Sequence, residues 1–167
     1  MDVQHAFRIV PVHPDELHKL CFQADCFYFV DTRLSFGSRS SPFICNTFAD
    51  FLRWYLTVTI RIAVIIHYLD EFLIVASDFT TCNLHVSKML SACARLGVLI
   101  NRNKLVGPST VLTYLGILID TENMQIRLPP EKLESLKNLL ATWSSKVKCK
   151  KRELLSLIGK CLLRAKW

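Results

Sequence analysis

The sequence predicts an α+β fold, with antiparallel strands and helices in its first part and a helical hairpin at its end. Two continuous apolar runs of strand length, residues 62–66 and 72–76, flank a short acidic turn. In four other segments apolar residues recur every three or four positions, which is the spacing of one helix face. Pro129 and Pro130 separate the two parts, because consecutive prolines interrupt regular structure.

Residues 1–35 are rich in aromatic and β-branched side chains and predict mainly strand, with a short turn or helix after Asp2. Residues 20–23 and 26–34 predict a hairpin around Ala24-Asp25. Pro42 marks the start of a helix, and Ser40 and Ser41 are its candidate caps. The expected core face of this helix consists of Ile44, Phe48, Phe51, Leu52 and Tyr55.

The two apolar runs lack the alternation of a half-buried strand, so we expect both of their faces to be buried. A second helix covers residues 81–96, and Gly97 ends it. Residues 111–120 and 124–128 predict another hairpin, which turns at residues 121–123. The expected core face of the second helix consists of Val86, Met89, Leu90, Cys93 and Leu96.

The last segment predicts two helices joined by a basic stretch, residues 146–152. We therefore divide the chain into a domain over residues 1–128 and a helical segment over residues 129–167. The first apolar stripe consists of Leu133, Leu136, Leu140 and Trp143, and the second of Leu154, Leu157, Ile158, Cys161 and Ala165.

The formal net charge of +7 is unevenly distributed along the chain. Residues 1–126 contain 10 Lys+Arg and 11 Asp+Glu, whereas residues 127–167 contain 11 Lys+Arg and 3 Asp+Glu. A basic surplus favours an anionic partner, and here it lies in the helical segment. The hydrophobic fraction of 51% supports a buried core and excludes wholesale disorder.

Seven cysteines without a C-x-x-C pair, together with a polar N-terminus, argue against a disulfide framework, a zinc module and a signal peptide. We expect reduced thiols, no disulfide partner and an intracellular, non-secreted protein. The apolar stretch 57–76 is not expected to cross a membrane, because charged side chains are costly in lipid. This stretch contains Arg61, His67, Asp70 and Glu71.

The acidic turn, Tyr68-Leu69-Asp70-Glu71, is the sharpest chemical signal. Two adjacent carboxylates at the tip of an apolar hairpin repel each other and resist desolvation. A divalent metal bound through oxygen would compensate them. The alternative is an ordinary solvated turn, in which acidic residues are common.

Two other segments carry weaker signals. Residues 2–7 place Asp2 before a small residue and an aromatic one. Residues 34–42 combine Gly37, which permits close backbone approach, with Arg39, which suits phosphate, ahead of a helix N-terminus that favours anions. Taken singly, they are explained by an exposed terminal aspartate and by a plain strand-to-helix loop.

Taken together and in this order, the three segments resemble the palm motifs of reverse transcriptases: D-x-x-x-A-F, L-P-x-G-x-x-x-S/A-P and Y-x-D-D. Asn103-Lys104 resembles the lysine-bearing loop of that family, residues 112–116 its Y-L-G strand, and residues 129–167 the start of its thumb. Residues 9–14, 66–70 and 152–160 are similar to DIRS-type tyrosine-recombinase retrotransposons. The resemblance implies a partial polymerase palm, an antiparallel sheet backed by two helices, over residues 1–128 and a helical thumb-like segment after it.

The resemblance also implies template-directed addition of dNTPs to the 3′ end of a primer–template duplex (RNA/DNA or DNA/DNA), with two Mg²⁺ or Mn²⁺ ions. Asp2 and Asp70, with Glu71 and the carbonyl of Val3, would be the catalytic and metal-binding groups. Lys104 would protonate the pyrophosphate, although a solvated surface lysine is the alternative. The expected nucleotide-binding residues are Phe7, Phe36, Gly37 and Arg39, and the expected primer grip is Tyr68, Tyr114, Leu115 and Gly116. The residues expected to contact backbone phosphates are Lys146, Lys148, Lys150, Lys151 and Arg152. The alternative is that these charges belong to a solvated linker.

Four departures from the family pattern predict impaired activity. Glu71 stands where the motif has aspartate, and Mg²⁺ demands a near-ideal shell; Ser35 replaces the usual proline. We also expect the fingers region to be missing before Asp2, which would then lie on a frayed chain end, and no RNase H region to follow. Three alternatives stay open: an impaired polymerase acting in the cytoplasm or nucleus, a non-catalytic nucleic-acid-binding remnant, and an unstable translated fragment.

Overall fold

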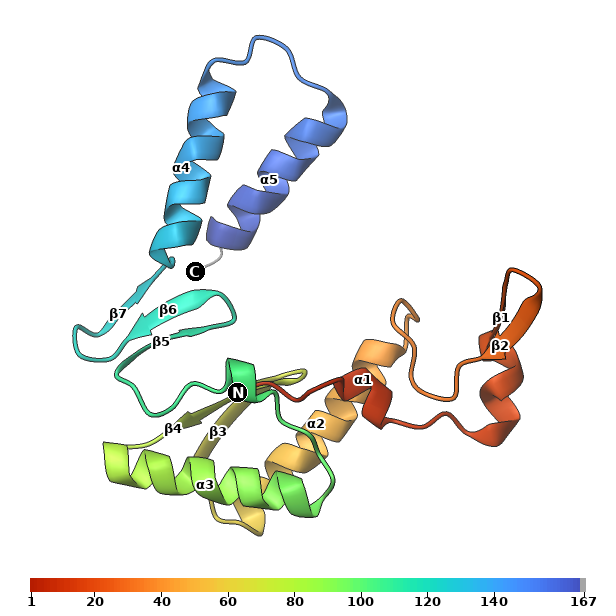
Figure 1. Ribbon diagram of the computed structural model, residues 1–167. Coiled ribbons are helices and arrows are strands. Elements are labelled where there is room, and N and C mark those ends of the chain that lie inside the picture. The colour runs from red at the N-terminus through yellow and green to blue at the C-terminus, as the bar shows by residue number, and fades with distance from the viewer. Residues whose placement is uncertain (166–167) are drawn as a thin grey trace. The chain divides into compact units, whose positions relative to one another are not determined.

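The computed structural model describes the backbone of residues 1–165 and the side chains of residues 1–161. These form two compact units, one over Met1–Ser109 and one from Thr110 onward (Figure 1). Each unit combines helices with small antiparallel sheets, so the predicted α+β class is confirmed. None of the described helices is long and apolar enough to cross a membrane.

The first unit contains two β-hairpins and two long helices. The hairpins are β1–β2 and β3–β4, both antiparallel, and the hairpin expected around Ala24-Asp25 is therefore confirmed. The elements in order are α1 (Ala6–Ile9), η1 (Pro14–Leu20), β1 (Cys21–Ala24), β2 (Phe27–Val30), α2 (Ser41–Val58), β3 (Val64–Tyr68), β4 (Glu71–Val75), α3 (Phe79–Arg95) and η2 (Arg102–Lys104).

The core of this unit lies between the β3–β4 hairpin and the two long helices. Helix α2 contacts β3, and α3 contacts β4 (Figure 1). Ile65 and Phe72 point from the hairpin into this core. The helices contribute Cys45, Ala49, Leu52, Leu56, Met89, Ala92 and Cys93. The hairpin that ends in the acidic turn is therefore held from one side by both helices.

The expectation that β3 and β4 are buried on both faces was wrong. Val64, Ile66 and Val75 are 46%, 49% and 44% exposed, whereas Ile65 is 7% exposed. Successive side chains of a strand point to opposite faces, and the helices cover only one of them. The continuous apolar runs thus leave one apolar face of the hairpin uncovered by the described residues.

The expected core face of α2 was only partly correct. Leu52 is fully buried, but Ile44 and Phe51 are 38% and 50% exposed. The buried stripe instead runs through Cys45 and Ala49, whose small side chains let the helix approach the sheet closely. Ser40 is the N-cap residue, as expected, but its side chain makes no capping hydrogen bond.

Helix α3 follows its prediction more closely. Met89 and Cys93 are fully buried, but Leu96 is 43% exposed and Ala92 takes its place in the core. The helix begins after Asp78, whose carboxylate accepts a hydrogen bond from the Thr81 amide at 2.8 Å, a typical N-cap.

The second unit is a three-stranded antiparallel sheet followed by two helices. The strands are β5 (Val111–Tyr114), β6 (Ile117–Asp120) and β7 (Gln125–Arg127), in the order β5-β6-β7. The helices are α4 (Pro130–Ser144) and α5 (Lys151–Ala165), which confirms the two predicted helices. The side chain of Ala165, assigned to the second stripe, lies outside the described residues.

Residues 111–120 were expected to be one strand, but a turn at Leu115-Gly116 divides them. Both turn residues have positive φ, 50° and 77°, which suits a two-residue hairpin. The Gly116 carbonyl accepts a hydrogen bond from Lys132 Nζ at 3.2 Å. Lys132 therefore ties the turn to the first part of α4.

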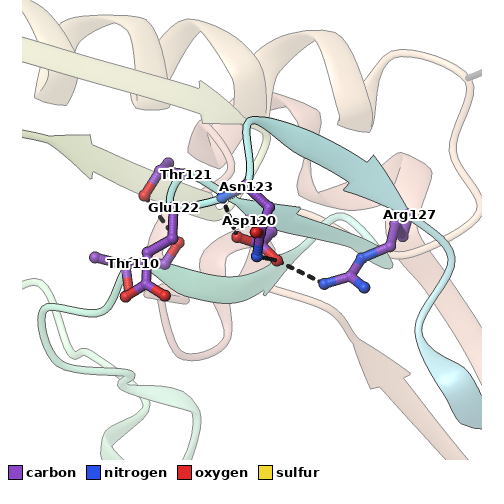
Figure 2. A network of polar contacts seen from close by, with 6 residues as sticks. All are labelled: Thr110, Asp120, Thr121, Glu122, Asn123 and Arg127. Carbon is purple, nitrogen blue, oxygen red and sulfur yellow. Dashed lines mark hydrogen bonds and ion pairs between the residues drawn. The ribbon is translucent and has the colours of Figure 1, made fainter.

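A polar network holds the second turn of this sheet, as Figure 2 shows. The buried carboxylate of Asp120 accepts hydrogen bonds from the Asn123 amide at 2.9 Å and from Arg127 Nη2 at 2.6 Å. The Asn123 bonds, followed by Arg127, lower the pKa of Asp120. Thr110 Oγ1 donates to Glu122 at 2.6 Å, so residues before β5 join the same network. The turn predicted at residues 121–123 is confirmed.

Candidate active site

The acidic turn is a tight hairpin that carries Asp70 at its tip. Tyr68 pairs with Glu71, which leaves only Leu69 and Asp70 in the turn. Leu69 has a φ of 53°, in the left-handed region that branched side chains rarely adopt. Such backbone strain costs on the order of 1–3 kcal/mol and clusters at functional sites.

The N-terminal residues form an extended segment inserted between two others. Val3 donates its N–H to the Asp70 carbonyl at 2.9 Å, and the Phe72 N–H donates to the Met1 carbonyl at 2.7 Å. On the other side, Asn101 donates its N–H to the Asp2 carbonyl at 2.9 Å. The expectation that Asp2 lies on a frayed chain end was therefore wrong, because backbone hydrogen bonds fix it from both sides.

This pairing brings the two principal aspartates of the predicted site to the same end of the β3–β4 hairpin. Asp2 forms a bridge pair with Glu71, next to the turn residue Asp70. Asp2 is only 8% exposed, and Asp70 and Glu71 are half-buried. Residues separated by about seventy positions thus share one end of the β3–β4 hairpin.

Lys104 supplies a cation to this acidic end of the hairpin. Its Nζ donates to Asp2 Oδ2 at 2.9 Å. The hydrogen bond and charge of Asp2, followed by the charges of Glu71 and Asp70, raise the pKa of Lys104 above its usual value. The lysine that the resemblance singled out is therefore a partner of the carboxylates, not an isolated surface residue.

The donor atoms at this end fit a hard divalent cation. Aspartate oxygens are ligands that Mg²⁺ and Mn²⁺ prefer, and the Lys104 ammonium shows that Asp2 accepts a cation. Among the residues that the structure describes, no group of three or more His, Cys, Asp or Glu side chains is arranged to hold a metal ion. The carboxylate oxygens are thus chemically suited to bind Mg²⁺ or Mn²⁺, but the described side chains are not arranged as a three-carboxylate shell.

Two of the expected nucleotide-binding residues lie in direct contact. The rings of Phe7 and Phe36 have centroids 4.8 Å apart, tilted by 39°. Phe36 is 72% exposed, and the next residue, Gly37, has a φ of 87° with open space where a side chain would lie. Arg39 is also exposed. These residues form an open edge that begins five residues after Asp2.

The expected primer-grip residues fall in different units. Tyr68 lies in the first unit and is 61% exposed. Tyr114, Leu115 and Gly116 lie in the second unit, where the last two form the β5–β6 turn. Lys132, which holds that turn, was missed because nothing in the sequence links it to Gly116.

Of the five residues expected to contact phosphates, Lys146 forms an ion pair among the described residues and the other four are exposed. Lys146 Nζ lies 3.0 Å from Glu153 Oε1 and 5.0 Å from the centre of the Trp143 ring. The remaining four residues of the set are exposed: Lys148, Lys150, Lys151 and Arg152. Four of the five cations are therefore accessible to an anionic partner.

His67 links β3 to α2, a contact between two elements that no sequence pattern specifies. Its Nε2 lies 3.1 Å from Asp50 Oδ1 of α2, and its ring stacks on Phe72 at 5.3 Å. The side chain is 7% exposed. Because alternate residues of a strand share one face, His67 lies on the same covered face as Ile65. The continuous apolar run of the sequence does not reveal this alternation.

The fold and the carboxylate-bearing hairpin define an α+β domain with an acidic centre, and comparisons with known proteins identify its class. The family model described as reverse transcriptase (RNA-dependent DNA polymerase) matches residues 1–119. The chain therefore belongs to the reverse transcriptase family. A search of curated proteins found no match.

Solved structures with the same fold include three of foamy viral protease-reverse transcriptase. The structure in complex with dsDNA has 19% identity and a TM-score of 0.79, and covers 97% of this chain and 31% of that one. The dRH form in complex with ds DNA has 20% identity and a TM-score of 0.77, and the match covers 95% of this chain and 26% of that one. The structure in complex with an RNA/DNA hybrid has 19% identity and a TM-score of 0.75, and the match covers 95% of this chain and 20% of that one. This chain thus spans between a fifth and a third of the length of those proteins.

Proposed function

We propose that this chain is the palm segment of a reverse transcriptase and adds dNTPs to the 3′ end of a primer paired with a template. The observation that carries the proposal is the meeting of Asp2 and Asp70 at one end of the β3–β4 hairpin, with Lys104 2.9 Å from Asp2. The structures of similar fold were solved with dsDNA and with an RNA/DNA hybrid, which supports a nucleic-acid partner.

The proposed chemistry uses the carboxylates as ligands for Mg²⁺ or Mn²⁺. Bound there, the metal would lower the pKa of the primer hydroxyl and neutralise the triphosphate. Asp2 and Asp70 would hold it, with Glu71 and the Val3 carbonyl completing the shell. The raised pKa of Lys104 keeps its ammonium charged at neutral pH, which suits a group that faces phosphate oxygens.

Side chains other than the carboxylates take the binding roles in the proposal. The Phe7–Phe36 pair offers an apolar surface for the nucleotide sugar, and Arg39 a cation for its phosphates. The exposed cations of residues 148–152 bind backbone phosphates, so affinity for a duplex should fall with salt. Tyr68, at the exposed end of β3, supports the primer end.

Three finer assignments are part of the proposal. The DIRS-type affiliation rests on the sequence of residues 9–14, 66–70 and 152–160. The place of action is the cytoplasm or nucleus, where a retroelement polymerase meets nucleic acid. The division into a palm over residues 1–128 and a thumb-like segment over residues 129–167 is kept as a functional division.

Primer extension on RNA and DNA templates, with Mg²⁺ or Mn²⁺, tests the proposal. We expect slow extension by the natural chain, because the longer Glu71 side chain displaces its carboxylate. Glu71→Asp should raise the rate on the order of tenfold, which equals about 1.4 kcal/mol of barrier. Asp70→Ala should abolish extension while leaving duplex binding in a gel-shift assay intact.

The exposed Glu134 of α4 offers a matched control, because Glu134→Asp makes the same change outside the site. If Glu71→Asp and Glu134→Asp extend primers equally, the proposed role of Glu71 is refuted.

A second function, nucleic-acid binding without catalysis, is favoured by one specific observation. Asp2 is already paired with Lys104, and no three-ligand metal group is formed by the described residues. Duplex binding without extension in either metal, for both the natural chain and Glu71→Asp, would establish this second function and exclude the first.

A further inference from the structure

The Lys104–Asp2 ion pair occupies the carboxylate that a metal would need. We propose that Lys104 is a tethered counter-cation that competes with the divalent ion for Asp2 and so weakens metal binding to this chain. The inference rests on the proposed function, because it takes Asp2 as a metal ligand. It adds a regulatory role for Lys104 in the absence of metal and nucleotide.

The two partners differ in how firmly they are held. The Asp2 side chain is 12% exposed, whereas that of Lys104 is 63% exposed. Backbone hydrogen bonds on both sides fix Asp2. Lys104 ends the three-residue turn η2 and has a long flexible stem. The carboxylate is therefore a fixed site, and the ammonium is the group that can leave.

A divalent ion bound to Asp2 Oδ2 and the ammonium that this oxygen already accepts would repel each other. Lys104 donates to Asp2 Oδ2 at 2.9 Å, a distance at which a metal bound to that oxygen would strongly repel the ammonium. Binding is thus an exchange, in which the ion takes Oδ2 and the charged ammonium moves into solvent. Part of the free energy of metal binding is spent on breaking the ion pair.

The chain offers a matched control for the effect of charge alone. Arg102 lies in the same η2 turn and is exposed. It forms no ion pair with the acidic residues among the described contacts. Lys104→Gln and Arg102→Gln therefore make the same change in net charge on one turn, but only the first removes the competitor of the metal.

Mn²⁺ binding to the whole chain, measured by electron paramagnetic resonance of the free ion, tests the inference. We expect Lys104→Gln to bind Mn²⁺ about tenfold more tightly than the natural chain, since charge-assisted hydrogen bonds are among the stronger ones. Lys104→Arg, which keeps the cation, should bind within about twofold of the natural chain. Arg102→Gln should also stay within about twofold, because salt screens a solvated charge.

Thermal unfolding gives a second, independent readout. Lys104→Gln should lower Tm without metal, because Asp2 loses its partner, and saturating Mn²⁺ should raise its Tm by more than that of the natural chain. Circular dichroism before heating shows that each variant is folded. Asp2→Asn should remove Mn²⁺ binding and identifies the site.

The outcomes separate the two proposals. Equal Mn²⁺ affinity in the natural chain and Lys104→Gln would overturn the competition and leave the metal centre standing. An equal gain in Lys104→Gln and Arg102→Gln would also overturn it, because net charge would then explain the effect. If no variant binds Mn²⁺, or if Asp2→Asn binds it as the natural chain does, the metal centre itself fails and the inference with it.

Discussion

Phe72 links the core of the first unit to the acidic end of the hairpin, and its removal should be severely destabilising. The side chain is 2% exposed and stacks on His67 at a centroid distance of 5.3 Å. Truncating a buried phenylalanine to alanine costs about 3–5 kcal/mol. A domain of this size has a stability of about 5–15 kcal/mol, so Phe72→Ala should lose between about a fifth and all of it.

Two matched variants calibrate this value. Phe72→Leu keeps most of the apolar volume but loses the ring contact, which is worth about 0.5–1.5 kcal/mol. Phe43→Ala removes the same ring from a position that is 76% exposed and should change stability by less than about 0.5 kcal/mol. The backbone bond from Phe72 to the Met1 carbonyl remains in all variants, so the difference isolates the side chain.

Urea unfolding followed by circular dichroism measures these differences as shifts of the midpoint at constant slope. The expected order of stability is Phe43→Ala, then Phe72→Leu, then Phe72→Ala. If Phe72→Ala and Phe43→Ala cost the same, the packing of β4 against the helices is not as described, and the reasoning fails.

Two further predictions concern ionisable groups. The pKa of Asp120 lies below its usual 3.8, so its stabilising effect is full above that value and is lost as pH falls through the lower folded pKa. Asp120→Asn should therefore lower Tm at pH 7 but much less at pH 2; an equal loss at both pH values would contradict the network of Figure 2. Burial raises the pKa of Cys93 to about 11, so native alkylation read by mass spectrometry should modify the exposed Cys149 and spare Cys93, whereas equal labelling would show an open core.

The sequence predicted where elements begin and end better than which face they bury. The β3–β4 hairpin, both long helices and the helical pair were recognisable from apolar spacing and turn residues. The phase of α2 was not, because Phe51 and Leu52 are adjacent and equally apolar, while only Leu52 is buried. Periodicity identifies a helix, but the shape of the opposing sheet determines which helix face is buried. In α2 the buried face carries the smaller side chains.

The candidate site shows the same division. Asp2, Asp70 and Lys104 were chosen by motif, and the structure brings them to one end of a hairpin. The contacts of Lys132 and His67 were not predicted, because their partners, Gly116 and Asp50, lie 16 and 17 positions away in the sequence. No local pattern encodes a contact between residues on different elements.

The sequence by itself determined the α+β class, the order of the motifs and the types of functional group, because these depend on local spacing and side-chain chemistry. Only the tertiary structure decided that Asp2 is fixed between two neighbouring segments and that Lys104 occupies its carboxylate. Those contacts join residues about seventy to a hundred positions apart, and they form only when burial of the β3–β4 hairpin brings the segments together. The physical reason is that charge pairing depends on distance in space, which the core sets and the local sequence does not.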